Sequence, residues 1–81
     1  MNIIIYYKTG CPYATEVMDY LNEHDLSFIE RDISANEEFR REVEGKSGQS
    51  KSPTLDIEGH IIADAGVEDV AEYLESVGIE V

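Results

Sequence analysis

Runs of apolar residues predict four strands along the chain. The stretch Asn2–Tyr7 is continuously apolar after its first residue and suits a central strand that is covered on both faces. Leu26–Ile33 indicates a second strand, parallel to the first because a helix separates them. Thr54–Ile57 alternates as a half-buried strand does. Glu58-Gly59 then predicts a tight turn into a fourth strand, His60–Ala63.

Apolar residues at helical spacing predict three helices. Pro12 suits the first position of the first helix, where its missing N–H is not needed, and this makes Cys11 the N-cap residue. Ser34 followed by Glu37 is a capping-box pattern for the second helix, and Gly45 is its expected stop. The apolar stripe of the first helix is Ala14, Val17, Met18 and Leu21, and that of the last is Val67, Val70, Ala71 and Leu74, with Gly78 as the stop.

The predicted element order is β-α-β-α-β-β-α. A four-stranded mixed sheet flanked by three helices buries every apolar stripe, so the sequence predicts an α/β fold of this type. The length of 81 residues favours a single domain, residues 1–81, with a modest core.

Composition and charge narrow the class of protein. The apolar share of 42% is that of a globular chain, and no run of about 18 apolar residues predicts a membrane span. The N-terminus has no signal-peptide pattern, so we expect a cytoplasmic protein. The net charge of −12 argues against nucleic acid or an anionic membrane as a partner. A solvated surface explains this charge more simply than a basic docking partner, and we expect a monomer.

Cys11 is the only cysteine, and its position makes it the candidate nucleophile. A thiol at a helix N-cap faces unpaired backbone N–H groups and the positive end of the helix dipole, which both stabilise the thiolate. Lys8 in the same turn adds a positive charge. Reactive cysteines in such settings have pKa values of about 3.5–7.5, against about 8.5 for a free thiol. The two histidines, His24 and His60, lack the spacing of metal ligands.

Three motifs resemble those of glutaredoxins. Lys8–Ala14, Lys-Thr-Gly-Cys-Pro-Tyr-Ala, resembles the active-site loop that ends in Cys-Pro-Tyr-Cys. Ser47–Gln49 followed by Ser52-Pro53 resembles the second loop, in which a Thr-Gly-Gln segment leads to a cis proline, and Gly59 matches the hairpin glycine. The resemblance covers essentially the whole chain and implies a thioredoxin-like fold.

The resemblance also implies a reaction, in which the cysteine takes glutathione from a mixed disulfide and a second glutathione releases it. The expected partners are glutathione, or another low-molecular-weight thiol, and glutathionylated proteins. Glutathione acts as a co-substrate, and no metal is expected. The implied catalytic residues are Cys11 and Lys8, and the implied glutathione-binding residues are Lys8, Pro12, Tyr13, Gln49, Ser52, Pro53, Asp64 and Ala65.

Two departures from the family pattern bear on this interpretation. Ala14 stands where the second cysteine is usual, which leaves only a monothiol route, resolved by an external thiol. Ala65-Gly66-Val67 stands where the family has Cys-Asp-Asp, and the segment that ends in Tyr73-Leu74 is also similar to the N-terminal domain of glutathione transferases. Two alternatives stay open: a glutathione-assisted [2Fe–2S] cluster carrier, and a non-catalytic thiol-binding or partner-binding module.

Overall fold

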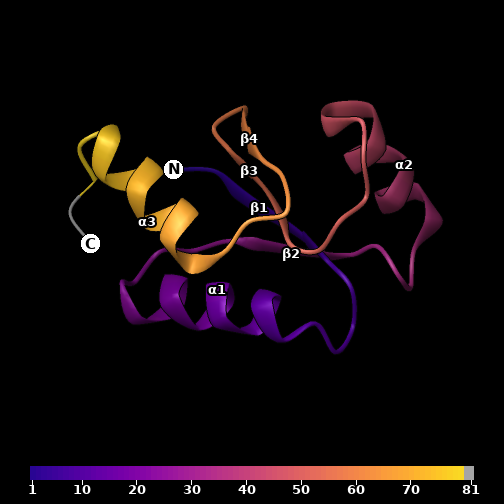
Figure 1. Cartoon of the computed structure of the whole chain (residues 1–81), viewed down its shortest axis with the longest axis horizontal. Coiled ribbons are helices and arrows are strands. Elements are labelled where there is room, and N and C mark those ends of the chain that lie inside the picture. The colour runs from indigo at the N-terminus through magenta and orange to yellow at the C-terminus, as the bar shows by residue number, and fades with distance from the viewer. Residues whose placement is uncertain (80–81) are drawn as a thin grey trace.

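The strand β1 (Ile3–Tyr7) is the centre of the fold, because it pairs with a neighbour on each side. In this computed structural model, which describes residues 1–79, β1 runs parallel to β2 (Ile29–Asp32) and antiparallel to β3 (Thr54–Ile57). β3 also pairs antiparallel with β4 (His60–Ile62), so the sheet order is β2-β1-β3-β4. The predicted element order and the four-stranded mixed sheet are confirmed (Figure 1).

Three helices cover the two faces of this sheet (Figure 1). α1 (Pro12–Glu23) and α3 (Val67–Ser76) lie on one face, and α2 (Glu37–Ser47) lies on the other. The predicted stripes of α1 and α3 supply buried residues to one apolar cluster with β1 and β3. Among residues 1–79, no helix combines the length and apolarity that crossing a lipid bilayer requires.

Both ends of α2 differ from the prediction. The helix begins after Asn36, whose side chain accepts hydrogen bonds from two backbone N–H groups of the first turn. The predicted capping box was wrong, because the hydroxyl of Ser34 bonds to Asp32 instead. Gly45 was also wrong as the stop: it lies inside the helix, and Gly48 ends it in the left-handed conformation, with φ of 72°.

Two strands differ from the prediction as well. β2 begins at Ile29 and not at Leu26, because the N–H of Leu26 donates to the end of α1, 2.9 Å from the carbonyl oxygen of Leu21. β3 is not half-buried: of its four residues, only Asp56 is partly exposed. The physical reason is that β3 lies inside the sheet, between β1 and β4. Leu55 and Ile57 pack in the apolar cluster of one face, and on the other face the Thr54 hydroxyl donates to the carbonyl oxygen of Lys51.

Candidate active site

The loop between β1 and α1 places Cys11 at the start of a helix, as predicted. Cys11 is the N-cap residue of α1, with extended backbone angles, and Pro12 follows at the first helical position. Gly10 adopts the left-handed conformation, with φ of 82°. The N–H of Cys11 donates to the carbonyl oxygen of Lys8 at 3.1 Å, which closes the turn. The thiol is thus held, partly exposed, at the N-terminal end of α1.

A second loop, residues 48–53, lies against the thiol. The Sγ of Cys11 lies 3.6 Å from the carbonyl oxygen of Ser52, to which the thiol donates. The backbone N–H of Lys8 donates to the hydroxyl oxygen of Ser52 at 2.9 Å, so this residue bonds to both ends of the Cys11 turn. The bond between Ser52 and the buried Pro53 is cis. The structure therefore brings together four of the predicted site residues, from segments about 40 residues apart.

The pKa of the Cys11 thiol lies below its ordinary value. Partial burial raises this pKa, but the side chain of Ser52, the N–H groups of Ala14 and Tyr13, and the charge of Lys8 together outweigh burial. Because the Ser52 hydroxyl oxygen accepts from a backbone N–H, its hydrogen is free to point at the sulfur. The thiol itself makes no capping hydrogen bond, so these N–H groups act on the thiolate. The arrangement favours the nucleophilic form of Cys11.

The segment that precedes α3 is hydrogen-bonded to Pro53. The N–H of Ala65 donates to the carbonyl oxygen of Pro53 at 2.8 Å. Asp64 and Ala65, together with Gly66, line a pocket of about 320 Å³ that is also bordered by the ring of Tyr13. Tyr13 is 63% exposed, so its ring is available to a ligand. Tyr13, Asp64 and Ala65 thus line one pocket, and the buried Pro53 is bonded to its edge at Ala65.

Gln49 lies in the same loop, but its side chain is turned inward. Its Nε2 donates to the hydroxyl oxygens of Ser47 at 2.6 Å and Thr54 at 3.1 Å. Its Oε1 accepts from the backbone N–H of Lys51 at 2.6 Å. These bonds hold the loop in shape, and among residues 1–79 the side chain of Gln49 makes no hydrogen bond to the cysteine turn. Its predicted role towards glutathione stays a prediction.

The sequence analysis missed a polar cluster that fixes the cysteine turn to the end of β2. Thr9 donates its hydroxyl to the carboxylate of Asp32, and its backbone N–H donates to the Ser34 hydroxyl at 3.2 Å. Bonds from the side chains of Ser34 and Thr9, which outweigh the opposing effect of burial, lower the pKa of Asp32 to about 2. The sequence signal was Asp32-Ile33-Ser34 at the carboxyl end of a parallel strand, because the carboxyl ends of neighbouring parallel strands meet at one edge.

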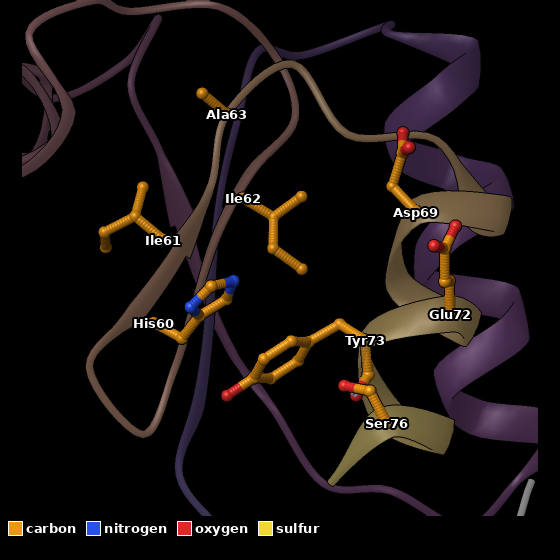
Figure 2. Close-up of a pocket in the computed structure, with 8 residues that line it drawn as sticks. All are labelled: His60, Ile61, Ile62, Ala63, Asp69, Glu72, Tyr73 and Ser76. Atoms are coloured by element: carbon orange, nitrogen blue, oxygen red, sulfur yellow. Dashed lines mark hydrogen bonds between the residues drawn. The ribbon is translucent and has the colours of Figure 1, made fainter.

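A further pocket, of about 460 Å³, lies between β4 and α3 and contains none of the predicted site residues (Figure 2). The ring of His60 stacks on that of Tyr73, with centroids 4.0 Å apart and planes 2° apart. His60 is thereby engaged in packing. Within residues 1–79, no three side chains of His, Cys, Asp or Glu are grouped as metal ligands would be.

Comparison with known proteins shows the family to which this chain belongs. The family model for glutaredoxin matches residues 3–62, which include the Cys11 turn, the Ser52-Pro53 loop and the hairpin. The chain belongs to the glutaredoxin family. Ala14 makes it a glutaredoxin with a single cysteine, since the usual second cysteine is absent from its sequence.

Relatives of this glutaredoxin span different degrees of similarity. N-acetyl-S-hydroxy-L-cysteine reductase of Bacillus subtilis is 37% identical over 57 residues, which are 70% of this chain and 61% of the Bacillus protein. The solution structure of a glutaredoxin from Brucella melitensis is 32% identical, with a TM-score of 0.67, over 96% of this chain and 82% of that one. A buckwheat glutaredoxin–glutathione complex, 18% identical, shares the fold with a TM-score of 0.71, over 93% and 69% of the two chains.

These comparisons support thiol oxidoreductase activity as the class of function. The matching family uses glutathione, and the Bacillus relative is named as a reductase. The match spans less than two thirds of that relative's length, so its substrate stays a property of that protein.

Proposed function

We propose that this glutaredoxin reduces mixed disulfides between glutathione and proteins by a monothiol mechanism through Cys11. The observation that carries the proposal is the setting of the thiol. Cys11 stands at a helix N-cap, partly exposed and with a lowered pKa, while position 14 offers no second thiol. An external thiol must therefore complete each cycle.

The reaction has two exchange steps. The Cys11 thiolate attacks the glutathione sulfur of the mixed disulfide, so a new S–S bond forms while the protein thiolate leaves and takes up a proton from water. The thiolate of a second glutathione then attacks the adduct on Cys11. This step yields oxidised glutathione and regenerates the Cys11 thiolate. In the net reaction the S–S bond between protein and glutathione is exchanged for an S–S bond between two glutathiones, so the sulfur of the incoming glutathione is oxidised to the disulfide level and the protein sulfur is reduced to a thiol.

The surrounding residues support this chemistry by position. Lys8 lowers the pKa of Cys11 and leaves a positive charge next to the thiol. We assign the backbone of Ser52, before the cis Pro53, to the binding of a peptide-like ligand, and we assign Pro12 and Tyr13, which follow Cys11, to the surroundings of the sulfur. We assign Asp64 and Ala65 to the far end of the ligand, because they line the pocket that Tyr13 borders. Gln49 serves this site by holding the 48–53 loop.

The test is turnover of a glutathionylated peptide in excess glutathione, with the wild type beside Cys11→Ser. We expect turnover by the wild type that Cys11→Ser abolishes, because the hydroxyl is a much weaker nucleophile than the thiolate. A circular dichroism spectrum like that of the wild type establishes that the variant is folded. Equal rates for the two proteins, or no rate above the reaction without protein, would refute the proposal.

A further inference from the structure

The pocket that Tyr13 borders continues along the start of α3. A second pocket, of about 250 Å³, is also lined by Tyr13 and Gly66, and it adds Glu16 of α1 and Glu68 and Asp69 of α3. The two pockets share residues and form one groove, which we call the Tyr13 groove. Two links connect it to the cysteine turn: Tyr13 follows Cys11 by two residues, and the N–H of Ala65 donates to the carbonyl oxygen of Pro53, the residue after Ser52.

Carboxylates dominate the charge of the Tyr13 groove. Its lining includes four of them, from Glu16, Asp64, Glu68 and Asp69, and no Lys, Arg or His. Lys51 offsets Asp64 in part, with its Nζ 3.9 Å from Oδ2. Within residues 1–79, the side chains of Glu16 and Glu68 make neither a hydrogen bond nor a salt bridge, so their charges are free to act on a ligand.

The N-terminus of α3 gives little room for an added anion. The N–H of Gly66 already donates to the Oδ2 of Asp69 at 2.8 Å. Glu68 and Asp69, both in the first turn, offset the positive end of the helix dipole with charges of the chain itself. A ligand carboxylate placed here would meet charges of its own sign, whereas an ammonium group would meet opposite ones.

Lys8 places a positive charge at the sulfur end of the site, opposite in sign to the carboxylates of the Tyr13 groove. It lies in the Cys11 turn, where its charge lowers the pKa of the thiol, and by itself it favours ligands with a carboxylate. A preference for cationic ligands would therefore come from the Tyr13 groove and not from the cysteine turn.

We propose that the Tyr13 groove selects disulfides of aminothiols, in which the arm beyond the sulfur ends in an ammonium group, over disulfides whose arm ends in a carboxylate. Glu16 and Glu68 are the residues that set this specificity. The inference rests on the proposed function, because it concerns the thiol that Cys11 takes up. Glutathione, whose γ-glutamyl end carries both groups, is accepted through its ammonium group.

Three symmetrical disulfides of nearly equal size test the inference: cystamine, bis(2-hydroxyethyl) disulfide and 3,3′-dithiodipropionate, with cationic, neutral and anionic ends. The rate of adduct formation on Cys11 is measured by mass spectrometry at low salt. Each rate is divided by the rate of the same disulfide with 2-mercaptoethanol, which removes differences in intrinsic reactivity. We expect a corrected rate about tenfold higher for cystamine than for the anionic disulfide. One exposed ion pair contributes a factor of about 1.4 to 5, and here the attraction of the cation and the repulsion of the anion both contribute.

The double variant Glu16→Gln/Glu68→Gln assigns the preference to the groove. We expect the ratio to fall by about fourfold or more. The matched control is Glu23→Gln/Glu38→Gln, with one change in α1 and one at the second position of α2, as Glu68 is at the second position of α3. It removes the same net charge elsewhere and should keep the wild-type ratio. We also expect the wild-type ratio to shrink near 1 M salt, where the screening length is about 3 Å.

The outcomes separate the inference from the function on which it rests. A corrected rate that is equal for the three disulfides, or highest for the anionic one, would overturn the inference, as would an equal fall of the ratio in both double variants. The proposed function fails separately, if the adducts form but added glutathione does not release them. No adduct with any disulfide would overturn both.

Discussion

The two faces of the sheet bury side chains of different kinds. Under α1 and α3 the buried cluster is entirely apolar, with Leu55 of β3 and Leu74 of α3 both 0% exposed. Under α2 the buried cluster is small, formed by Tyr6, Ile33 and Val43, and charged groups surround it. Burial of apolar area is the main source of stability, so the first face supplies most of it.

A network of charged groups holds α2 to the second face. The hydroxyl oxygen of Tyr6 accepts from Lys46 at 2.8 Å and from Arg31 at 3.4 Å, and its hydrogen is donated to Glu42. Lys46 also pairs with Asp56 of β3 at 2.7 Å. Such bonds depend on direction and distance, so they fix where α2 and the loop after it lie. The comparison indicates that one face contributes most of the apolar burial, while the other is held by directional polar bonds.

The largest expected effect is the loss of a core leucine on the first face. Leu55→Ala should lower the free energy of unfolding by about 3 kcal/mol, because it leaves a cavity among well-packed apolar groups. Urea denaturation measures the change. Val77→Ala, at a position 49% exposed, is the control and should cost far less. Equal costs for the two variants would contradict the assignment of the core to this face.

A smaller loss is expected on the second face. Tyr6→Phe removes the hydroxyl shared by Lys46, Arg31 and Glu42 and should lower the free energy of unfolding by about 1–3 kcal/mol. Tyr20→Phe is the control, because within residues 1–79 the Tyr20 hydroxyl has no hydrogen bond, and its cost should be smaller. If urea denaturation gives Tyr6→Phe the smaller cost, the network contributes nothing to stability.

Acid should weaken the contact between β2 and the cysteine turn. Hydrogen bonds lower the pKa of Asp32 from 3.8 to about 2. A carboxyl with a lowered pKa contributes stability that is full above its unfolded pKa and is lost as the pH falls through the folded one. Between about pH 4 and pH 2 the wild type should thus lose more stability than Asp32→Asn, as measured by urea denaturation at each pH. Parallel losses would show that this carboxylate contributes no pH dependence.

The smallest expected effect concerns the charge of Lys8. Lys8→Gln should raise the pKa of Cys11 slightly, because that charge is a lesser cause of the lowered value than the hydrogen bonds from Ser52, Ala14 and Tyr13. The pH dependence of the rate of alkylation by iodoacetamide reports this pKa. Lys51→Gln, whose charge is paired with Asp64, should leave the curve closer to that of the wild type. If the pKa of Cys11 rose more in Lys51→Gln than in Lys8→Gln, Lys51 and not Lys8 would be the lysine that acts on the thiol.

Most of the fold followed from the sequence, because the apolar spacing, Pro12 and the Glu58-Gly59 turn act locally. The predictions were wrong where contacts with other segments determine the end of a helix or the burial of a strand. Ser34 has the side chain of an N-cap residue, but its hydroxyl accepts from the N–H of Thr9, which follows the neighbouring strand, and donates to Asp32 two residues earlier. The predicted half-burial of Thr54–Ile57 could not be corrected from the segment alone, because Thr54 on its second face is buried through bonds to Gln49 and Lys51 of the loop after α2.

In the candidate site, too, local features could be predicted from the sequence, whereas features set by contacts between segments could not. The activation of Cys11 was predictable, since a helix N-cap and a nearby lysine are both local features. The inward turn of Gln49 and the pairing of Lys51 with Asp64 depend on how the 48–53 loop folds back on the sheet. Sequence motifs indicated which residues gather, and the structure was needed to show which of them face the thiol.

The most direct test of the single-cysteine account is the intact mass of the protein after mixing with a glutathionylated peptide and no free thiol. We expect one glutathione on Cys11 of the wild type, stable until glutathione is added and then lost. In Ala14→Cys the same adduct should decay without added thiol, because a neighbouring thiol can displace it. A wild type that forms no adduct on Cys11, or that loses it before any thiol is added, would contradict the account.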